Sequence, residues 1–131
     1  MVKSESCKEF IQRKQRQFEQ ELETLKTVSM KDIGRKGKHR FIREAWTFMQ
    51  QYNLPEKVFV FERLRKVGID GRVVHKRTQK NGEIEYRIGY FIIGKIGFMH
   101  GHWAWGQFCP VIPARDFTKL LQKAKREKTI L

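Results

Sequence analysis

Cysteine is scarce in this sequence, and long apolar runs are absent. The two cysteines, Cys7 and Cys109, lie far apart and form no CxxC pair. A disulfide framework is therefore not expected, and a reducing cytoplasm is the expected location. No apolar run is long enough to cross a bilayer, and residues 1–14 lack the apolar core of a signal peptide. We therefore expect an intracellular, soluble protein without a membrane partner.

Acidic residues are also few. The chain has 28 Lys and Arg against 14 Asp and Glu, which gives a formal net charge of +14. Such an excess opposes the compact state by self-repulsion, so it commonly persists because an anion binds. Nucleic acid, either DNA or RNA, is the commonest polyanion in a cytoplasm, and we expect it as the partner. The alternative is a solvated, lysine-rich surface without a ligand.

The composition predicts a folded protein rather than a disordered one. Hydrophobic residues make up 40% of the chain and aromatic residues 12%. At 131 residues the chain is expected to form one basic α+β domain over 1–131. Within it, 1–28 is expected to be a long amphipathic surface helix, 29–40 a basic glycine loop and 41–131 the core. No cofactor is implied.

Helical spacing of apolar residues predicts two helices near the N-terminus. Residues 5–27 contain no Gly or Pro, and their apolar stripe is thin. Residues 41–52, FIREAWTFMQQY, have a much broader apolar face. A third helix is predicted over 116–128, with cations toward its C-terminus, where they suit the helix dipole.

The middle of the chain predicts an antiparallel sheet. Asn81-Gly82 lies between two alternating runs, 72–79 and 83–94, and predicts a hairpin. Residues 102–109 are expected to form the next strand, antiparallel to the last. Residues 55–68 suit either a strand or a helix, and their β-branched and aromatic content favours a strand. The expected architecture is two N-terminal helices, a β-meander of three to four strands and a C-terminal helix packed on the sheet.

An alternative architecture rests on residues 61–88, FERLRKVGIDGRVVHKRTQKNGEIEYRI. This segment resembles the helix-plus-wing end of a winged-helix domain, in which a basic helix precedes a glycine-tipped hairpin. If 59–67 were helical, Arg63, Arg65 and Lys66 would be candidates for the major groove. The fold would then be winged-helix-like with an extended sheet.

The basic loop and the hairpin carry the candidate phosphate contacts. A basic glycine loop that leads into a helix would bind phosphate through its cations, backbone N–H groups and the helix dipole. The loop is no Walker A motif, because GxxxxGK[ST] is absent. The predicted nucleic-acid-binding residues are Arg35, Lys36, Lys38, His39, Arg40, Arg72, Lys76, Arg77, Lys80 and Arg87.

Residues 100–110, HGHWAWGQFCP, offer weaker chemistry. His100 and His102 would share one strand face and are weak metal-site candidates, since zinc needs three or four ligands and Cys109 has the opposite parity. The apolar neighbours of Cys109 predict a buried, structural thiol. Trp103 and Trp105 share the other face, where a covering helix is expected; exposed, they would stack on bases.

Three functions are consistent with these features. The expected one is non-enzymatic binding of nucleic acid through phosphates. A second is a small basic interaction, inhibitor or accessory protein that docks on a ribonucleoprotein or nucleic-acid-processing complex through helix 5–27. A third is a small metal-dependent nuclease, for which Asp70, Glu83 and Glu85 are weak catalytic candidates.

Overall fold

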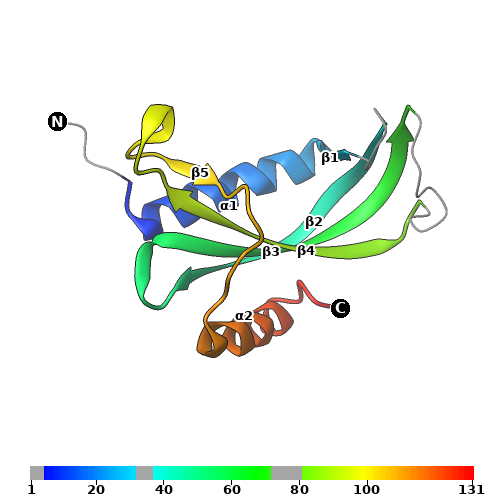
Figure 1. Ribbon diagram of the computed structural model, residues 1–131. Helices are drawn as coiled ribbons and strands as arrows, with labels where there is room; N and C mark the ends of the chain where they lie inside the picture. Colours follow the sequence, from blue (N-terminus) through cyan, green and yellow to red (C-terminus); the bar gives the residue numbers. More distant parts are fainter. Residues whose placement is uncertain (1–4, 32–36, 72–80) are drawn as a thin grey trace.

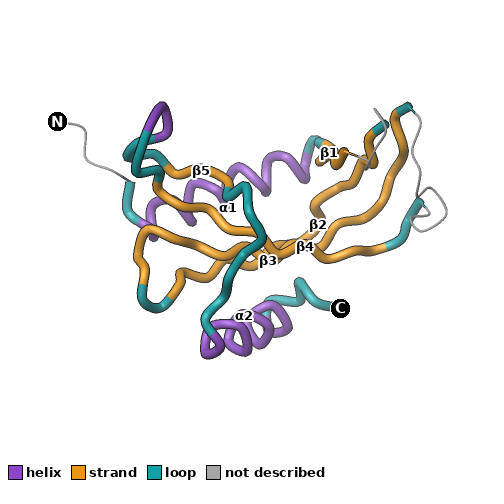
Figure 2. The backbone as a smooth tube through the Cα atoms, viewed as in Figure 1, coloured by secondary structure: helices purple, strands orange, loops and turns teal. Residues whose placement is uncertain are grey.

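The computed structural model describes residues 5–31, 37–71 and 81–131. They form a curled, five-stranded antiparallel sheet with strand order β1-β2-β3-β4-β5, with one helix on each face (Figure 1, Figure 2). The elements are α1 (Cys7–Glu23), β1 (Thr27–Lys31), β2 (Lys38–Gln51), β3 (Leu54–Asp70), β4 (Ile84–Ile93), β5 (Trp103–Trp105) and α2 (Ala114–Arg126). A short 3-10 turn, Gly97–Met99, lies between β4 and β5.

Each terminal segment contains a helix, α2 close to the predicted 116–128 and α1 within the predicted 5–27, but α1 ends at Glu23 and Thr27 and Val28 belong to β1. A capping box starts α1: the Glu9 N–H donates to the Ser6 hydroxyl at 3.1 Å, and the Ser6 N–H donates to the Glu9 carboxylate. Phe10 and Phe18 of α1 are buried against the sheet. On the opposite face, α2 buries Leu120 and Ala124. A helix is therefore present in both segments, and the N-terminal one is shorter than predicted.

The predicted second helix over 41–52 is wrong, because most of this segment lies in β2. Helices cover both faces of the sheet, so β2 is apolar on both sides and lacks the polar alternation of a half-buried strand. A register shift between Arg43 and Ala45 also lets Arg43 and Trp46, three residues apart, reach the α1 face. This spacing imitates a helix.

The number of strands also differs from the prediction. The meander has five strands rather than three or four, because residues 27–31 and 38–51 add β1 and β2. Part of the predicted loop 29–40 therefore belongs to strands. The prediction of a strand over 55–68 is confirmed by β3. Since 59–67 lie inside that strand, the winged-helix alternative is wrong.

Along one side β4 pairs with β3, with Lys57 opposite Ile92 and Arg65 opposite Ile84. The hairpin that the sequence predicts between 72–79 and 83–94 is not tested by this pairing. Residues 72–80 lie outside the described residues. β3 lies at the centre of the sheet, and its residues from Val58 to Phe61 are buried.

A carboxylate lies at the centre of the α1 face. Glu62 of β3 is fully buried, and it accepts hydrogen bonds from Arg43 Nε of β2 at 2.5 Å and Arg87 Nε of β4 at 2.6 Å. Arg43 also donates to Glu21 of α1 at 2.9 Å. The group of Glu62, Arg43, Arg87 and Glu21 therefore ties three strands and one helix together.

We expect Glu62→Gln to lower the free energy of unfolding by about 3–5 kcal/mol, because removing one partner leaves buried charge uncompensated. Urea denaturation followed by circular dichroism measures the loss. The matched control is Glu127→Gln at an exposed i,i+4 pair with Lys123 of α2, which should change stability by less than about 0.5 kcal/mol. Equal losses in the two variants would contradict the role of Glu62.

Candidate nucleic-acid interface

Most ion pairs of the described residues use the few carboxylates to hold arginines in place. Glu44 accepts from Arg63 and Arg65 at 2.8 and 2.9 Å. The remaining arginine pairs are Arg13 with Glu5, Arg40 with Asp70, Arg43 with Glu21 and Glu62, and Arg87 with Glu62. Because these acids are engaged with structural arginines, they do not neutralise the cations that project into solvent elsewhere.

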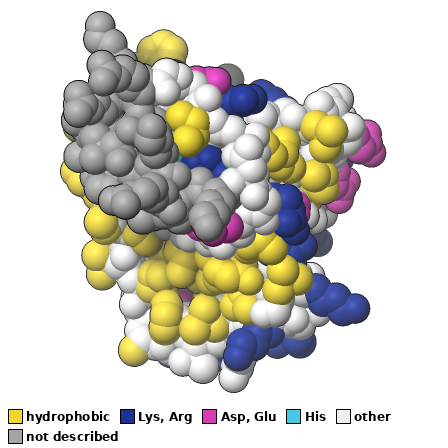
Figure 3. Space-filling view, turned by 90° about the vertical axis from the view of Figure 1, so that its right-hand side faces the viewer, with side chains coloured by type: hydrophobic (Ala, Val, Ile, Leu, Met, Phe, Trp, Pro, Cys, Tyr) yellow, Lys and Arg dark blue, Asp and Glu magenta, His cyan; other side chains and the backbone are white. Residues whose placement is uncertain are grey.

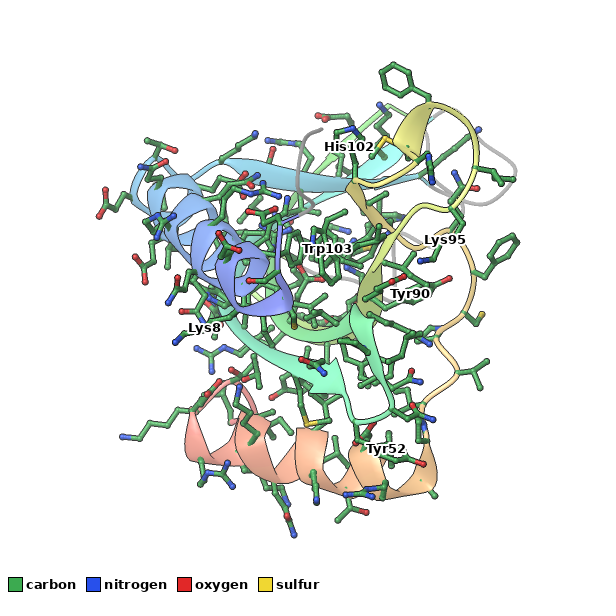
Figure 4. All side chains as sticks on the ribbon, turned by 90° about the vertical axis from the view of Figure 1, so that its left-hand side faces the viewer. Lys8, Tyr52, Tyr90, Lys95, His102 and Trp103 are labelled. Carbon is green, nitrogen blue, oxygen red and sulfur yellow. The ribbon has the colours of Figure 1, made fainter. Side chains whose placement is uncertain are left out.

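The outer side of α2 carries such cations. Five side chains in and just after this helix are exposed, and none of them enters an ion pair within the part of the chain that the structure describes. We call this set the basic α2 face: Arg115, Lys119, Lys125, Arg126 and Lys128. In Figure 4, many side chains that point away from α2 end in nitrogen atoms. This is a surface that attracts polyanions.

The N-terminal end of α2 is anchored to the sheet. Asp116 is buried and accepts a hydrogen bond from the Tyr52 N–H, in the turn between β2 and β3, at 3.0 Å. The Arg115 guanidinium lies 4.1 Å from the centre of the exposed Tyr52 ring. Lys123 donates to the carbonyl oxygen of Phe48. The basic α2 face is therefore fixed on a rigid support and ends beside an exposed aromatic ring.

The structure does not gather the predicted phosphate contacts that it describes into one surface. Lys38 is exposed at the start of β2, whereas His39 is buried with its Nδ1 2.8 Å from Lys66 Nζ. Arg40 lies opposite Gly68 and is 3.1 Å from Asp70. Arg87 is bound to Glu62. The other six, Arg35, Lys36, Arg72, Lys76, Arg77 and Lys80, lie outside the described residues.

The weak catalytic candidates do not form a metal site. Asp70 ends β3 and pairs with Arg40, while Glu83 and Glu85 lie at the start of β4. Among the residues that the structure places, no group of three or more His, Cys, Asp or Glu side chains could hold a metal ion. A two-metal or one-metal nuclease needs such a cluster.

The strand predicted over 102–109 is shorter than expected, and both histidines lie outside it. His100 caps the 3-10 turn, and β5 begins only at Trp103, so His100 and His102 do not share a strand face. Figure 4 shows His102 on the outer loop. Cys109 is exposed, so the prediction of a buried thiol is wrong. Its apolar neighbours Phe108 and Val111 are themselves exposed, and burial therefore does not follow from their hydrophobicity.

The two tryptophans share a face, as their spacing predicts, but only one is covered. Trp103 stacks on Phe10 of α1 at 4.5 Å, and its Nε1 donates to the Glu5 carbonyl at 2.9 Å (Figure 4). Trp105 is 41% exposed, and the Arg87 guanidinium lies 4.9 Å from its ring centre. The ring lies over Gly89, where a Cβ atom would collide with it.

Sequence reasoning misses two features of the candidate interface. The sequence predicts the cations of α2 as a solvent-exposed helix face. Only the positions of the described carboxylates show that these cations enter no ion pair with them. The sequence pattern does not predict the exposure of Trp105, since Trp103 has the same residue type and the same parity. The contact with α1 alone distinguishes the two.

Comparison with known proteins finds no family model, no curated protein and no solved structure that matches the chain. No helix of the described residues is long and apolar enough to span a membrane. The described chain is an antiparallel meander covered by a helix on each face, with the basic α2 face on the outer side of one of these helices.

Acid should weaken the fold through these ion pairs. Burial alone would raise the pKa of Glu44, but hydrogen bonds and charge from Arg65 and Arg63 outweigh it and hold the pKa below its ordinary value. The hydrogen bond from Arg13 likewise lowers the pKa of Glu5. A carboxyl group whose pKa is lower in the folded protein stabilises the fold at pH values above its unfolded pKa of about 4.3. This stabilisation is lost as the pH falls through the folded pKa.

We therefore expect Glu44→Gln to be less stable than the parent at pH 7 and to lose stability less steeply between about pH 5 and 3. Urea titrations at several pH values measure both effects. Glu19→Gln is the control, since Glu19 is exposed on α1 and enters no ion pair within the described ranges. If Glu44→Gln lost stability with falling pH as steeply as the parent, Glu44 would not contribute to the acid sensitivity of the fold.

Proposed function

We propose that this protein binds nucleic acid without cleaving it, mainly through phosphates. The observation that carries the proposal is the basic α2 face, with five exposed cations outside any ion pair of the described residues. The net charge of +14 supports the same class of ligand. Contacts of this kind position a backbone and carry little sequence information.

The geometry of α2 suits a phosphate backbone. Arg115, Lys119 and Arg126 are separated by four and seven residues, so they lie along one side of the helix. A helix of 13 residues is about 20 Å long, which is enough to follow several phosphates. The exposed Tyr52 ring beside Arg115 provides a surface for a base at one end of this line. This arrangement favours a single strand, in which bases are free to stack.

The loop and hairpin cations of 35–40 and 72–80 remain part of the proposal as predicted contacts. The other two sequence-based functions receive less support. The apolar stripe of α1 packs on the sheet of its own chain, so it is not available to a partner helix. The acidic candidates for a nuclease are not gathered around a common point within the described residues.

The decisive experiment measures binding of fluorescent single- and double-stranded DNA and RNA by anisotropy as a function of salt. We expect Lys119→Gln with Arg126→Gln to weaken binding and to make the slope of log K against log salt shallower by about 1–2. The matched control is Lys8→Gln with Arg16→Gln, which removes two exposed cations from α1. Because α1 lies on the opposite face of the sheet, that change should have a much smaller effect.

Three outcomes would redirect the proposal. Equal losses in the α1 and α2 variants would show that only the total charge matters. A loss confined to Arg35→Gln with Lys36→Gln would move the site to the loop. No binding even at low salt would refute nucleic acid as the ligand. Magnesium is included in a parallel series, because the appearance of cleaved product would replace binding by nuclease activity.

A further inference from the structure

Trp105 offers an exposed aromatic ring at the edge of the sheet. It ends β5, the outermost strand next to β4, and 41% of the residue is exposed. Trp103, on the same face of β5, is instead covered by Phe10 of α1. Exposed rings of this kind are the surfaces on which proteins that bind single-stranded nucleic acid stack bases.

The backbone of β4 supports this ring. The six-membered part of the indole lies over Gly89, where a Cβ atom would be only 2.2 Å from Cη2 of the ring. Any other residue at position 89 would therefore displace the ring. Phe91 meets the indole edge to face, with 5.1 Å between the ring centroids. Because β4 lies beneath the ring, the exposed part of the ring is the part directed away from that strand.

Arg87 also restrains the ring. Its guanidinium lies 4.9 Å from the centre of the Trp105 ring, and two hydrogen bonds to the buried Glu62, at 2.6 and 3.2 Å, hold this guanidinium in place. A ligand of Trp105 does not need to contact Arg87, since this arginine acts by fixing the ring. A ring that is fixed before binding loses little conformational freedom when a ligand stacks on it.

We propose that Trp105 stacks on an unpaired base of a single-stranded nucleic acid. This contact depends on the proposed function and deepens it, because an unpaired base is then bound in addition to the phosphates. A base inside a duplex is stacked between its neighbours, so its face is not open to the ring. Every base has a π-face, so a contact of this kind carries little sequence preference.

The connection between β5 and α2 leads from Trp105 to the basic α2 face. Figure 1 shows it running from the end of β5 to the start of α2. Arg115 follows Trp105 by ten positions, so the two are at most roughly 35 Å apart. Residues 106–114 include no charged residue, and Phe108 and Val111 are each 80% exposed. Figure 3 shows Lys and Arg side chains at the lower part of the molecule, where α2 ends. A single strand that passes around the β5 edge would therefore reach both the ring and these cations.

Binding of matched oligonucleotides to Trp105→Leu, followed by anisotropy, tests the contact. We expect this variant to bind oligothymidylate and oligouridylate about fivefold or more weakly than the parent does, because stacking on one base is lost. Duplex DNA, and a strand of the same length whose sites are all abasic, should bind both proteins equally, since neither offers an unpaired base. The slope of log K against log salt should stay the same, because no cation is removed.

Two further variants control for folding and for exposed rings in general. Trp105→Phe keeps a ring at this position and should retain most of the affinity. Phe98→Leu removes a ring that is 97% exposed in the turn Gly97–Met99, and it should leave binding unchanged. Circular dichroism establishes that each variant is folded.

Tryptophan fluorescence of the parent tests the same contact without a substitution. Of the three tryptophans, Trp103 is buried and Trp46 is half-buried against Phe18, so Trp105 is the most accessible to acrylamide. We expect oligothymidylate to quench the emission and to protect it from acrylamide. The abasic strand should do neither.

Three results would overturn the stacking contact while leaving the proposed function in place. They are equal affinity of the parent for oligothymidylate and the abasic strand, equal losses for Trp105→Leu and Phe98→Leu, and a loss of duplex binding as large as the loss of single-strand binding. Absence of binding to every strand at low salt would overturn the proposed function as well. A loss confined to the DNA or the RNA strand would support stacking and identify which of the two is the ligand.

Discussion

The buried carboxylate of Glu62 is the interaction on which the rest of the structure depends. It lies on β3, the central strand, and binds arginines from the strand on each side. Arg43 then extends the group to Glu21 of α1, and its guanidinium lies 3.8 Å from the centre of the Phe18 ring. A buried charge group that joins α1, β2, β3 and β4 permits one register, because a shift of any strand would leave an unpaired charge in the interior.

This use of carboxylates shapes the surface as well as the interior. The chain has half as many acids as bases, and the described acids that hold arginines leave other cations without an opposite charge. Helices cover both faces of the sheet, so the surfaces left for ligands are the outer sides of the helices and the edges of the sheet. The basic α2 face is a surface of the first kind.

The sequence predicted the parts of this fold that depend on local pattern and missed those that depend on distant contacts. Both terminal helices follow from spacing and from the lack of Gly and Pro. The error at β2 arose because a strand covered on both faces, with a register shift near Ala45, has the apolar spacing of a helix. The different environments of Trp103 and Trp105 depend on the position of α1, which no local pattern encodes. The exposure of Cys109 likewise does not follow from its apolar neighbours. The cations proposed as site residues on α2 could be identified only once the ion pairs of the described carboxylates were known.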